Sequence, residues 1–404
     1  MFAVRFRHLA VAALLGGAAL ATATAAPASA DGTDTVYSTT PVKTWAVTGG
    51  QIYAMARVGN NIVIGGTFTA LKPPTGPSVP RDRIAMIDAS TGAPVATWNP
   101  GASAPVRALV TDGATVWAGG SFTTIGGVAK SDLAALSAST GAVLPGFAAN
   151  GNGEVRSLLL ANGRIYAGGL FTTVNAVQRV RLFAANPVTG VLDNAWKPTA
   201  SWAVNGMVPV PGTPNIALGG EFSTVTGQAR KYLASVNALT GAVQPWAPPA
   251  DCDNPSNPCI VRSIAASSTL VYAAVGGVGG RASAYDTTTG VRKWSQYGDG
   301  DVQVVALSGN TVYAGGHYDP LFGQLAGANL TRTELAAIDA TTGRVLPFAP
   351  DMHGGTGVWA ILPDTDGLRI GGLFSPVAGD ATIKNFALFR PVVAPLVTAQ
   401  LQIG

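Results

Sequence analysis

Charged side chains, histidines and cysteines are all scarce in this sequence of 404 residues. Asp, Glu, Lys and Arg make up 11% of the chain, against roughly 25% of an average soluble protein. The formal net charge is +4, and it falls to +2 if residues 1–30, which contain Arg5 and Arg7, are removed. So small a charge gives no electrostatic case for a nucleic-acid or anionic-membrane partner.

The motifs of several enzyme classes are also missing. The sequence contains no HExxH, no GxSxG, no phosphate-binding GxxxxGK and no complete GxGxxG. Its two cysteines are too far apart for a CxxC redox or zinc site. A glycosidase-type pair of carboxylates stays open, with Glu154, Asp251, Asp253, Asp301 and Asp351 as candidates.

Glycine is abundant, at 51 residues, and so is internal repetition. Residues 155–196 show the repeated unit: the run VRSLLL, a turn, the run IYAGGLFTTV, the run LFAAN and, after PVTG, a fourth run that ends at Trp196. Short runs rich in β-branched and aromatic residues, separated by turns, predict antiparallel strands. Four such strands form one blade of a β-propeller.

The unit recurs seven times. Each copy opens on Val or Ile and carries two adjacent glycines in its second strand. The glycine pairs lie at 65/66, 119/120, 168/169, 219/220, 276/277, 315/316 and 371/372. The openings are roughly 51 residues apart on average and lie at Ile52, Val106, Val155, Val204, Val261, Val302 and Val358. This period favours an all-β, seven-bladed propeller of four-stranded blades, kelch-like or quinoprotein-like rather than built from WD repeats.

Residues 1–30 predict a secretory signal peptide. Arg5 and Arg7 precede the apolar run LAVAALLGGAAL, and Ala28-Ser29-Ala30 is typical of a cleavage site. An uncleaved membrane anchor is the alternative, but the run is short for a span, and no later segment could cross a membrane. For a secreted chain we expect Cys252 and Cys259 to form a disulfide.

The two ends of the repeat array are complementary. Residues 40–45, TPVKTW, resemble the fourth strand of a blade but precede the first copy, whereas the seventh copy lacks its TG turn and final aromatic. We therefore expect the N-terminal strand to complete the last blade, which removes the free sheet edge. The expected propeller spans residues 31–392, and 393–404 form a tail.

One face of the propeller is expected to carry the longer loops. Connections from the second to the third strand and from the fourth to the next first strand share that face, and those predicted to be long and irregular are 71–80, 247–260, 295–301, 317–330 and 349–356. Function is usually placed on loops of a rigid scaffold. This face is therefore the expected binding face.

Two sets of polar residues recur on that face. The residue after each opening should lie at the mouth of the central channel, and this set, the mouth residues, is Tyr53, Arg107, Arg156, Asn205, Arg262, Gln303 and Trp359. A basic set precedes the third strands: Arg81, Lys130, Arg179, Arg230 and Arg332, with Arg281 nearby in the fifth copy. Such residues either bond to carbonyls between blades or bind a shared anionic ligand.

Metal binding is a further candidate on the same face. His317 and His353 could form a metal pair with Asp319 or Asp351, and the stretch 298–301, GDGD, could offer oxygens to calcium. Ordinary loop histidines and a solvated turn are the alternatives. No cofactor is predicted, and calcium is left open.

Two resemblances to known families follow from these residues. The recurring IYAGG-x-FT, followed by a basic residue and LAALDA-x-TG, resembles the delta-60 repeat proteins, secreted bacterial β-propellers of largely undefined role, over roughly residues 40–390. Residues 284–294, AYDTTTGVRKW, are similar to the tryptophan-docking motif of quinoprotein dehydrogenases, although other copies carry one extra residue before the aromatic. In that family the motif locks blades together and does not bind the quinone.

The sequence thus favours a secreted, monomeric propeller that acts as a binding or interaction module. Its expected ligand is an extracellular or cell-surface polymer, anionic if the arginines bind it, or another secreted protein; we expect no nucleic acid and no membrane span. The alternative is an extracellular enzyme, either a polysaccharide hydrolase or lyase or a quinone-dependent dehydrogenase.

Overall fold

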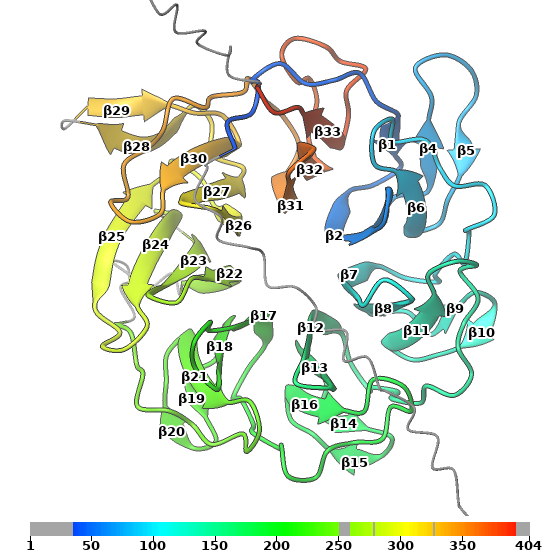
Figure 1. Ribbon diagram of the computed structural model, residues 1–404, viewed down its shortest axis with the longest axis vertical. Coiled ribbons are helices and arrows are strands. Elements are labelled where there is room, and N and C mark those ends of the chain that lie inside the picture. The colour runs from blue at the N-terminus through cyan, green and yellow to red at the C-terminus, as the bar shows by residue number, and fades with distance from the viewer. Residues whose placement is uncertain (1–34, 250–258, 278, 326–327, 393–404) are drawn as a thin grey trace, which may run out of the picture.

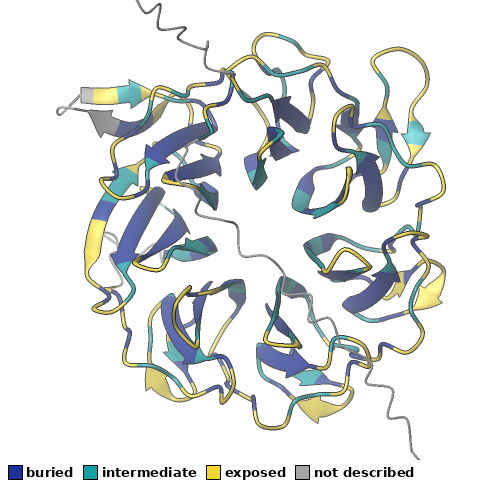
Figure 2. Ribbon diagram, viewed as in Figure 1, coloured by how far each residue is buried: buried dark blue, intermediate teal, exposed yellow. Residues whose placement is uncertain are grey.

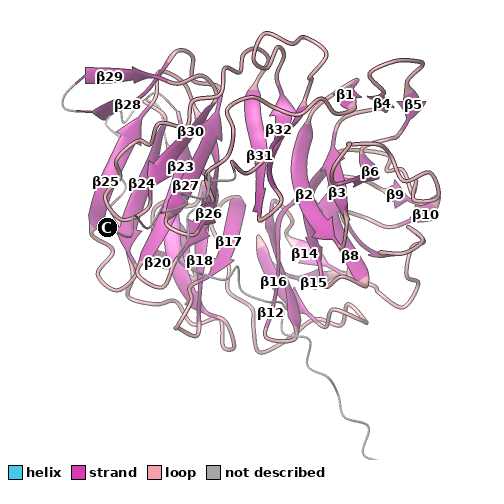
Figure 3. Cartoon of the chain, turned by 45° about the horizontal axis from the view of Figure 1, so that its top comes forward, coloured by secondary structure: helices cyan, strands magenta, loops and turns pink. Residues whose placement is uncertain are grey.

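The computed structural model describes residues 35–249, 259–277, 279–325 and 328–392. All regular elements in these residues are strands (Figure 3), and they include no helix long and apolar enough to cross a membrane. The segments predicted as signal peptide and tail, 1–30 and 393–404, lie outside the described residues, as does Cys252.

In the described residues, seven antiparallel sheets of three or four strands are arranged around a common centre (Figure 1), and further small sheets lie at the rim. In each sheet the first strand lies innermost. In chain order the sheets consist of β2 (Ile52–Val58), β3 (Asn61–Gly66) and β6 (Ile84–Asp88); β7 (Val106–Thr111), β8 (Thr115–Gly120) and β11 (Leu133–Ser137); β12 (Val155–Ala161), β13 (Arg164–Gly169) and β16 (Leu182–Ala185); β17 (Val204–Pro209), β18 (Asn215–Gly220) and β21 (Leu233–Asn237); β22 (Ile260–Ala266), β23 (Leu270–Gly276), β24 (Arg281–Asp286) and β25 (Arg292–Tyr297); β26 (Val302–Ser308), β27 (Thr311–Gly316) and β30 (Leu335–Asp339); β31 (Gly357–Asp364), β32 (Gly367–Leu373) and β33 (Phe386–Phe389). The middle strands are buried and the outer rim is exposed (Figure 2).

Short strands at the rim replace several of the predicted loops. The expectation of irregular connections at 71–80 and 317–330 is wrong, because both contain paired strands, and residues 295–297 belong to β25. The rim strands are β1 (Ala46–Thr48), β4 (Ala70–Lys72) and β5 (Val79–Pro80); β9 (Thr124–Ile125) and β10 (Val128–Ala129); β14 (Thr173–Val174) and β15 (Val177–Gln178); β19 (Thr224–Val225) and β20 (Gln228–Ala229); β28 (Leu321–Leu325) and β29 (Ala328–Thr331).

Among the described residues, the predicted fourth strand is complete only in the fifth sheet, where β25 pairs with β24. Five other sheets hold their fourth segment through a single bridge, as between Ile87 and Pro94 or Leu136 and Val143. Four of these segments contain proline, which lacks the N–H that a ladder needs. The fifth segment, VRKWSQY, has no proline and is rich in residues that favour strands.

Contacts between neighbouring sheets depend, in six of the seven copies, on the first glycine of the pair. A Cβ at Gly119 would lie 2.5 Å from Cγ1 of Val155, the residue that opens the next sheet. A Cβ at Gly371 would likewise lie 2.7 Å from Cγ2 of Ile52, so the last sheet packs on the first in the same way. The absent side chain therefore lets the sheets approach closely all around the ring.

The fifth copy departs from the predicted glycine register. Val261 pairs with Val275, and Ser263 with Ala274, so residues 274 and 275 take the places that the glycine pairs hold elsewhere. The assignment of Gly276 and Gly277 to those places was wrong by two residues. The sequence was misleading here because alanine, the smallest side chain after glycine, occupies the close contact.

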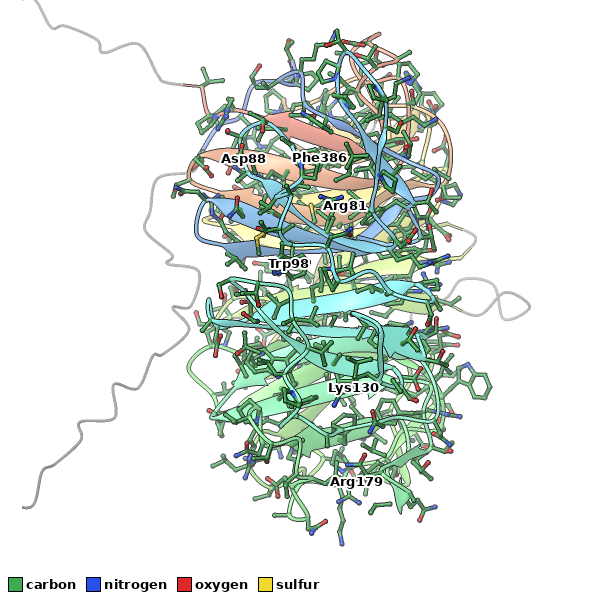
Figure 4. The ribbon with its side chains drawn as sticks, turned by 90° about the vertical axis from the view of Figure 1, so that its right-hand side faces the viewer. Arg81, Asp88, Trp98, Lys130, Arg179 and Phe386 are labelled. Carbon is green, nitrogen blue, oxygen red and sulfur yellow. The ribbon has the colours of Figure 1, made fainter. Side chains whose placement is uncertain are left out.

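Aromatic side chains form a second kind of contact between sheets. The indole N–H of Trp98 donates to the carbonyl of Ser137 in the next sheet at 3.1 Å, and that of Trp294 donates to Ala340 at 3.0 Å. Figure 4 shows Trp98 at the boundary between two sheets. Two TG-turn glycines lie beneath these indoles: a Cβ at Gly343, where φ is 74°, would be 2.4 Å from Cγ of Trp294, and one at Gly141 would be 3.3 Å from Cγ of Trp98.

The N-terminal segment lies against the last sheet. The N–H of Val42 donates to Leu388 at 2.7 Å, and the N–H of Trp45 donates to Thr91 of the first sheet at 3.0 Å. The junction also contains Arg369, whose fully buried side chain donates to the carbonyl of Ala89 at 2.9 Å. Residues from both ends of the chain thus meet at one place in the ring.

We expect Gly119→Ala to lower the free energy of unfolding by about 1–3 kcal/mol, because the new methyl group overpacks the contact with Val155. Gly146→Ala is the matched control, since a Cβ there meets no atom within 4 Å. Chemical denaturation compares the two. Equal stability of both variants would contradict the close-contact role of the paired glycines.

Candidate binding site

The seven mouth residues line a single cavity of about 650 Å³. Each comes from the innermost strand of a different sheet, and each occupies the same place in it. In all seven sheets the pairing of the first strand with the second shifts by one residue at this position. Tyr53, for example, is the extra residue between Ile52, which pairs with Gly66, and Ala54, which pairs with Gly65. Such bulges redirect a side chain, and here they produce a ring of seven side chains around the cavity.

One part of the ring is an ion-pair network. Glu154 accepts from Nε of Arg107 at 2.9 Å and from Nε of Arg156 at 2.7 Å. Arg156 also donates through Nη1 to Glu221 and to the amide oxygen of Asn205, both at 3.0 Å. Arg156 therefore joins two carboxylates and an amide.

These contacts set the charge of Glu154. Burial by itself would raise the pKa of this carboxyl, but the hydrogen bonds and charges of Arg156 and Arg107 outweigh burial and hold the pKa below its usual value. Glu154 is therefore ionised at neutral pH and neutralises part of the arginine charge.

The other part of the ring is aromatic and cationic. The rings of Tyr53 and Trp359 meet edge to face with centroids 5.5 Å apart. The guanidinium of Arg107 lies 3.8 Å from the centroid of Tyr53, and that of Arg262 lies 5.7 Å from the centroid of Trp359. Arg262 also donates to Asp301 at 2.8 Å. Cation–π contacts of this kind hold aromatic faces in fixed orientations.

The cavity can thus receive a ligand that has both an apolar face and polar edges. Tyr53 and Trp359 offer apolar faces, while Arg156, Asn205 and Glu221 offer donors and acceptors of both signs. Ligand pockets in general combine such apolar walls with a few placed polar groups. The arginines face three carboxylates, Glu154, Glu221 and Asp301, so the cavity is not simply cationic.

The basic set has a different role from the mouth residues. Arg230 donates to the carbonyl of Gln244 at 2.7 Å, and Arg332 donates to that of Leu346 at 2.7 Å. In each case the acceptor lies in the fourth segment of the same copy, so these bonds fasten that segment within its sheet rather than between blades. Figure 4 shows Arg81, Lys130 and Arg179 of this set one above another along the ring. Arg281 instead opens β24, with Nη2 at 3.9 Å from Sγ of Cys259.

The histidines and nearby carboxylates form two separate groups. His317 contacts Gln303, with 3.3 Å between Nδ1 and Nε2. His353 lies between Asp319 and Asp351, at 2.9 and 2.6 Å, and this arrangement raises its pKa, chiefly through the hydrogen bond with Asp319. The described residues contain no cluster of three or more His, Cys, Asp or Glu side chains arranged to hold a metal.

Other acidic residues are engaged by the protein itself. Asp299 accepts the N–H of Asp319 at 2.9 Å, and Asp301 accepts that of Gly277 at 2.6 Å. Of the remaining carboxylates considered for catalysis, Asp251 and Asp253 lie outside the described residues. Sequence reasoning did not find Glu221, although one signal was present: it directly follows a glycine pair, where other copies have Thr67, Ser121, Leu170, His317 or Leu373.

Comparisons with known proteins identify the fold but no family. No protein-family profile matches the chain, and no curated protein does. The chain is similar to the computationally designed Ika8 protein, with a TM-score of 0.52 and 14% identity over 87% of this chain and 99% of that one. It is also similar to the WD40 β-propeller domain of Doa1, with a TM-score of 0.55 and 12% identity over 88% and 97% of the two chains. Identities this low show the fold alone, so the chain is a β-propeller, a fold that commonly serves as a binding or interaction module.

Glu334 is a buried acid beside the predicted binding face. Its pKa can be tested through the pH dependence of stability. Its side chain is 3% exposed, and burial, together with the negative charge of Asp319, raises its pKa from 4.5 to about 8. Between pH 4.5 and about 8 the folded protein binds more protons at Glu334 than the unfolded chain does. Glu334 therefore lowers the free energy of unfolding as pH rises through this range. We expect Glu334→Gln to remove that loss and to be more stable than the parent at pH 8–9.

Thermal unfolding of Glu334→Gln and of the parent across pH 5–9 measures the effect, because a pKa that differs between the folded and unfolded states makes stability depend on pH. The difference between Glu334→Gln and the parent should grow with pH. Parallel stability curves would contradict a raised pKa for Glu334.

Proposed function

We propose that this protein is a secreted β-propeller that binds its ligand in the central cavity formed by the mouth residues. The observation that carries the proposal is the variety of residues at one structural position. Positions that hold the ring together repeat the same residue type, as with the opening Val or Ile, the glycine pairs and the TG turns. The bulged position instead holds Tyr, Arg, Arg, Asn, Arg, Gln and Trp. A purely structural role would not call for five different residue types at one position, whereas an asymmetric ligand would.

A binding module agrees with the chemistry of the cavity. Its side chains are held in place by ion pairs and ring contacts before any ligand arrives, which lowers the ordering cost of binding. Export of the chain and a Cys252–Cys259 bridge are further parts of the proposal, and they favour a cell-surface polymer or another secreted protein as the ligand. The delta-60 resemblance of the repeats supports the same reading.

A polysaccharide hydrolase is the second candidate, because Arg156, which lines the cavity, pairs with both Glu154 and Glu221. Glycoside hydrolysis needs a general acid with a raised pKa. The pKa of Glu154 is lowered instead. Binding without turnover is therefore favoured by the contacts of this carboxylate.

We expect Trp359→Ala to weaken binding of the ligand at least tenfold, about 1.4 kcal/mol, because it removes an aromatic wall of the cavity. Glycan and protein arrays identify the ligand, and calorimetry gives the affinity. Tyr297→Ala is the matched control, since Tyr297 is 44% exposed and is not among the residues that line the cavity. Unchanged affinity in Trp359→Ala, with the fold intact, would place the binding site elsewhere.

We also propose that the ring has seven blades and is closed by the N-terminal segment. The bond from Val42 to Leu388 supports closure, because it matches the bond from Val95 to Met86 in the first sheet and from Leu144 to Ala135 in the second. Tyr37 is 4% exposed and donates to Asp364 at 2.7 Å, which extends the contact.

Deletion of residues 31–46 should therefore expose the edge of β33 and cause aggregation or a large loss of stability. Deletion of 393–404 should have little effect. Differential scanning calorimetry with light scattering compares the two truncations. If both melt like the full mature chain, the N-terminal segment does not close the ring.

A further inference from the structure

An exposed tryptophan lies beside the cavity. Trp202 is 51% exposed, whereas Trp98 and Trp196 are fully buried. It lies in the segment before β17, three residues ahead of the mouth residue Asn205. Three residues of chain span at most about 10 Å, so Trp202 is close to the edge of the cavity.

The position of Trp202 is fixed from several sides. The preceding residue, Ser201, donates its N–H to Thr224 at 3.0 Å, and its hydroxyl accepts the N–H groups of Ser223 and Thr224. The following residue, Ala203, is fully buried. The backbone on both sides of the indole is therefore held in place.

Arg181 holds one side of the indole. Its guanidinium lies 5.3 Å from the ring centroid of Trp202 and donates to the carbonyl of Phe171 at 3.2 Å. Trp202 remains half exposed, so part of the indole is open to solvent and to a ligand. A tryptophan with a fixed orientation and an exposed ring surface can stack against a ligand.

The order of the sheets around the cavity shows where Trp202 lies relative to the other site residues. Tyr53 and Trp359 belong to the first and seventh sheets, and Asn205 belongs to the fourth, so the aromatic wall lies across the cavity from Asn205. A linear ligand that starts on Trp359 and crosses the cavity leaves it at Asn205, next to Trp202.

The chemistry along this path suits sugar units. A sugar ring has an apolar C–H face, which packs on aromatic rings, and hydroxyl groups that both donate and accept. Glu221 can accept from such hydroxyls, while Arg156 and Asn205 can donate to them. The arginines of the cavity are already paired with Glu154, Glu221 and Asp301, so a polyanion would find little uncompensated positive charge there.

We infer that the ligand is an uncharged extended glycan, with one sugar unit in the cavity against Trp359 and a later unit stacked on Trp202. This inference rests on the proposed function, because the first unit occupies the same cavity. The sugar position at Trp202 is a second subsite, so affinity should depend on the length of the glycan.

The test uses ladders of β-1,4-glucan, β-1,3-glucan, α-1,4-glucan, xylan and chitin oligosaccharides, from disaccharide to hexasaccharide, with calorimetry on the mature chain. For at least one ladder, affinity should rise with length. Trp202→Ala should lower affinity for the longest oligosaccharide about tenfold and leave that for the disaccharide unchanged. Trp202→Phe should keep most of the increase in affinity with oligosaccharide length. Val188→Ala is the control, since Val188 is 74% exposed in a turn between third and fourth segments.

The possible failures are distinguishable. If no ladder binds to the parent, the glycan assignment is overturned, and a protein ligand found on the arrays can still support the cavity. If Trp359→Ala abolishes glycan binding but Trp202→Ala has no effect at any length, the second subsite is overturned and the proposed function stands. If glycans bind and neither Trp359→Ala nor Trp202→Ala changes the affinity, both the subsite and the proposed site are overturned.

Discussion

The close approach of neighbouring sheets depends on side chains that are absent. In six of the seven copies the first glycine of the pair leaves room for the Val or Ile that opens the next sheet, from Gly65 beneath Val106 to Gly371 beneath Ile52. Any Cβ at these glycines would enter the space of the next sheet, so the contact tolerates little variation. Because the same contact recurs at the junction of the last and first sheets, each sheet is held by a neighbour on both sides.

This packing leaves the residue directly after each opening Val or Ile free to vary. The opening residue is buried against the neighbouring glycine, and the bulge directs the next residue into the cavity. Stability is thus supplied by one set of residues and cavity chemistry by another, although the two sets alternate along the same strand. The ion pairs of Arg156 show that the cavity residues also contact one another across sheets, so they form one connected site.

Much of this could be predicted from the sequence. Repetition of the glycine pairs and openings predicted an all-β propeller-like fold, and the register of those openings selected the seven residues that the structure brings to one cavity. The fifth copy was misaligned because Ala274 and Val275 stand where glycines were expected. Fourth strands were overestimated where proline, as at Pro94, removes a ladder donor.

The partners of the site residues could not be predicted, because they depend on contacts between distant copies. Glu221 meets Arg156 across 65 residues of sequence, and no local pattern marks that pair. Arg369 likewise reaches Ala89 at the opposite end of the chain. Trp202 occupies no repeated position, so only its exposure beside the cavity distinguishes it from the buried tryptophans.

The most direct test of the account is a crystal structure of the protein with the longest oligosaccharide that binds to it. The account predicts ordered sugar density against Trp359 and Arg156 inside the cavity, continuing past Asn205 to the exposed indole of Trp202. Sugar bound only at the outer rim, or only near the TG turns, with the cavity filled by water, would contradict it.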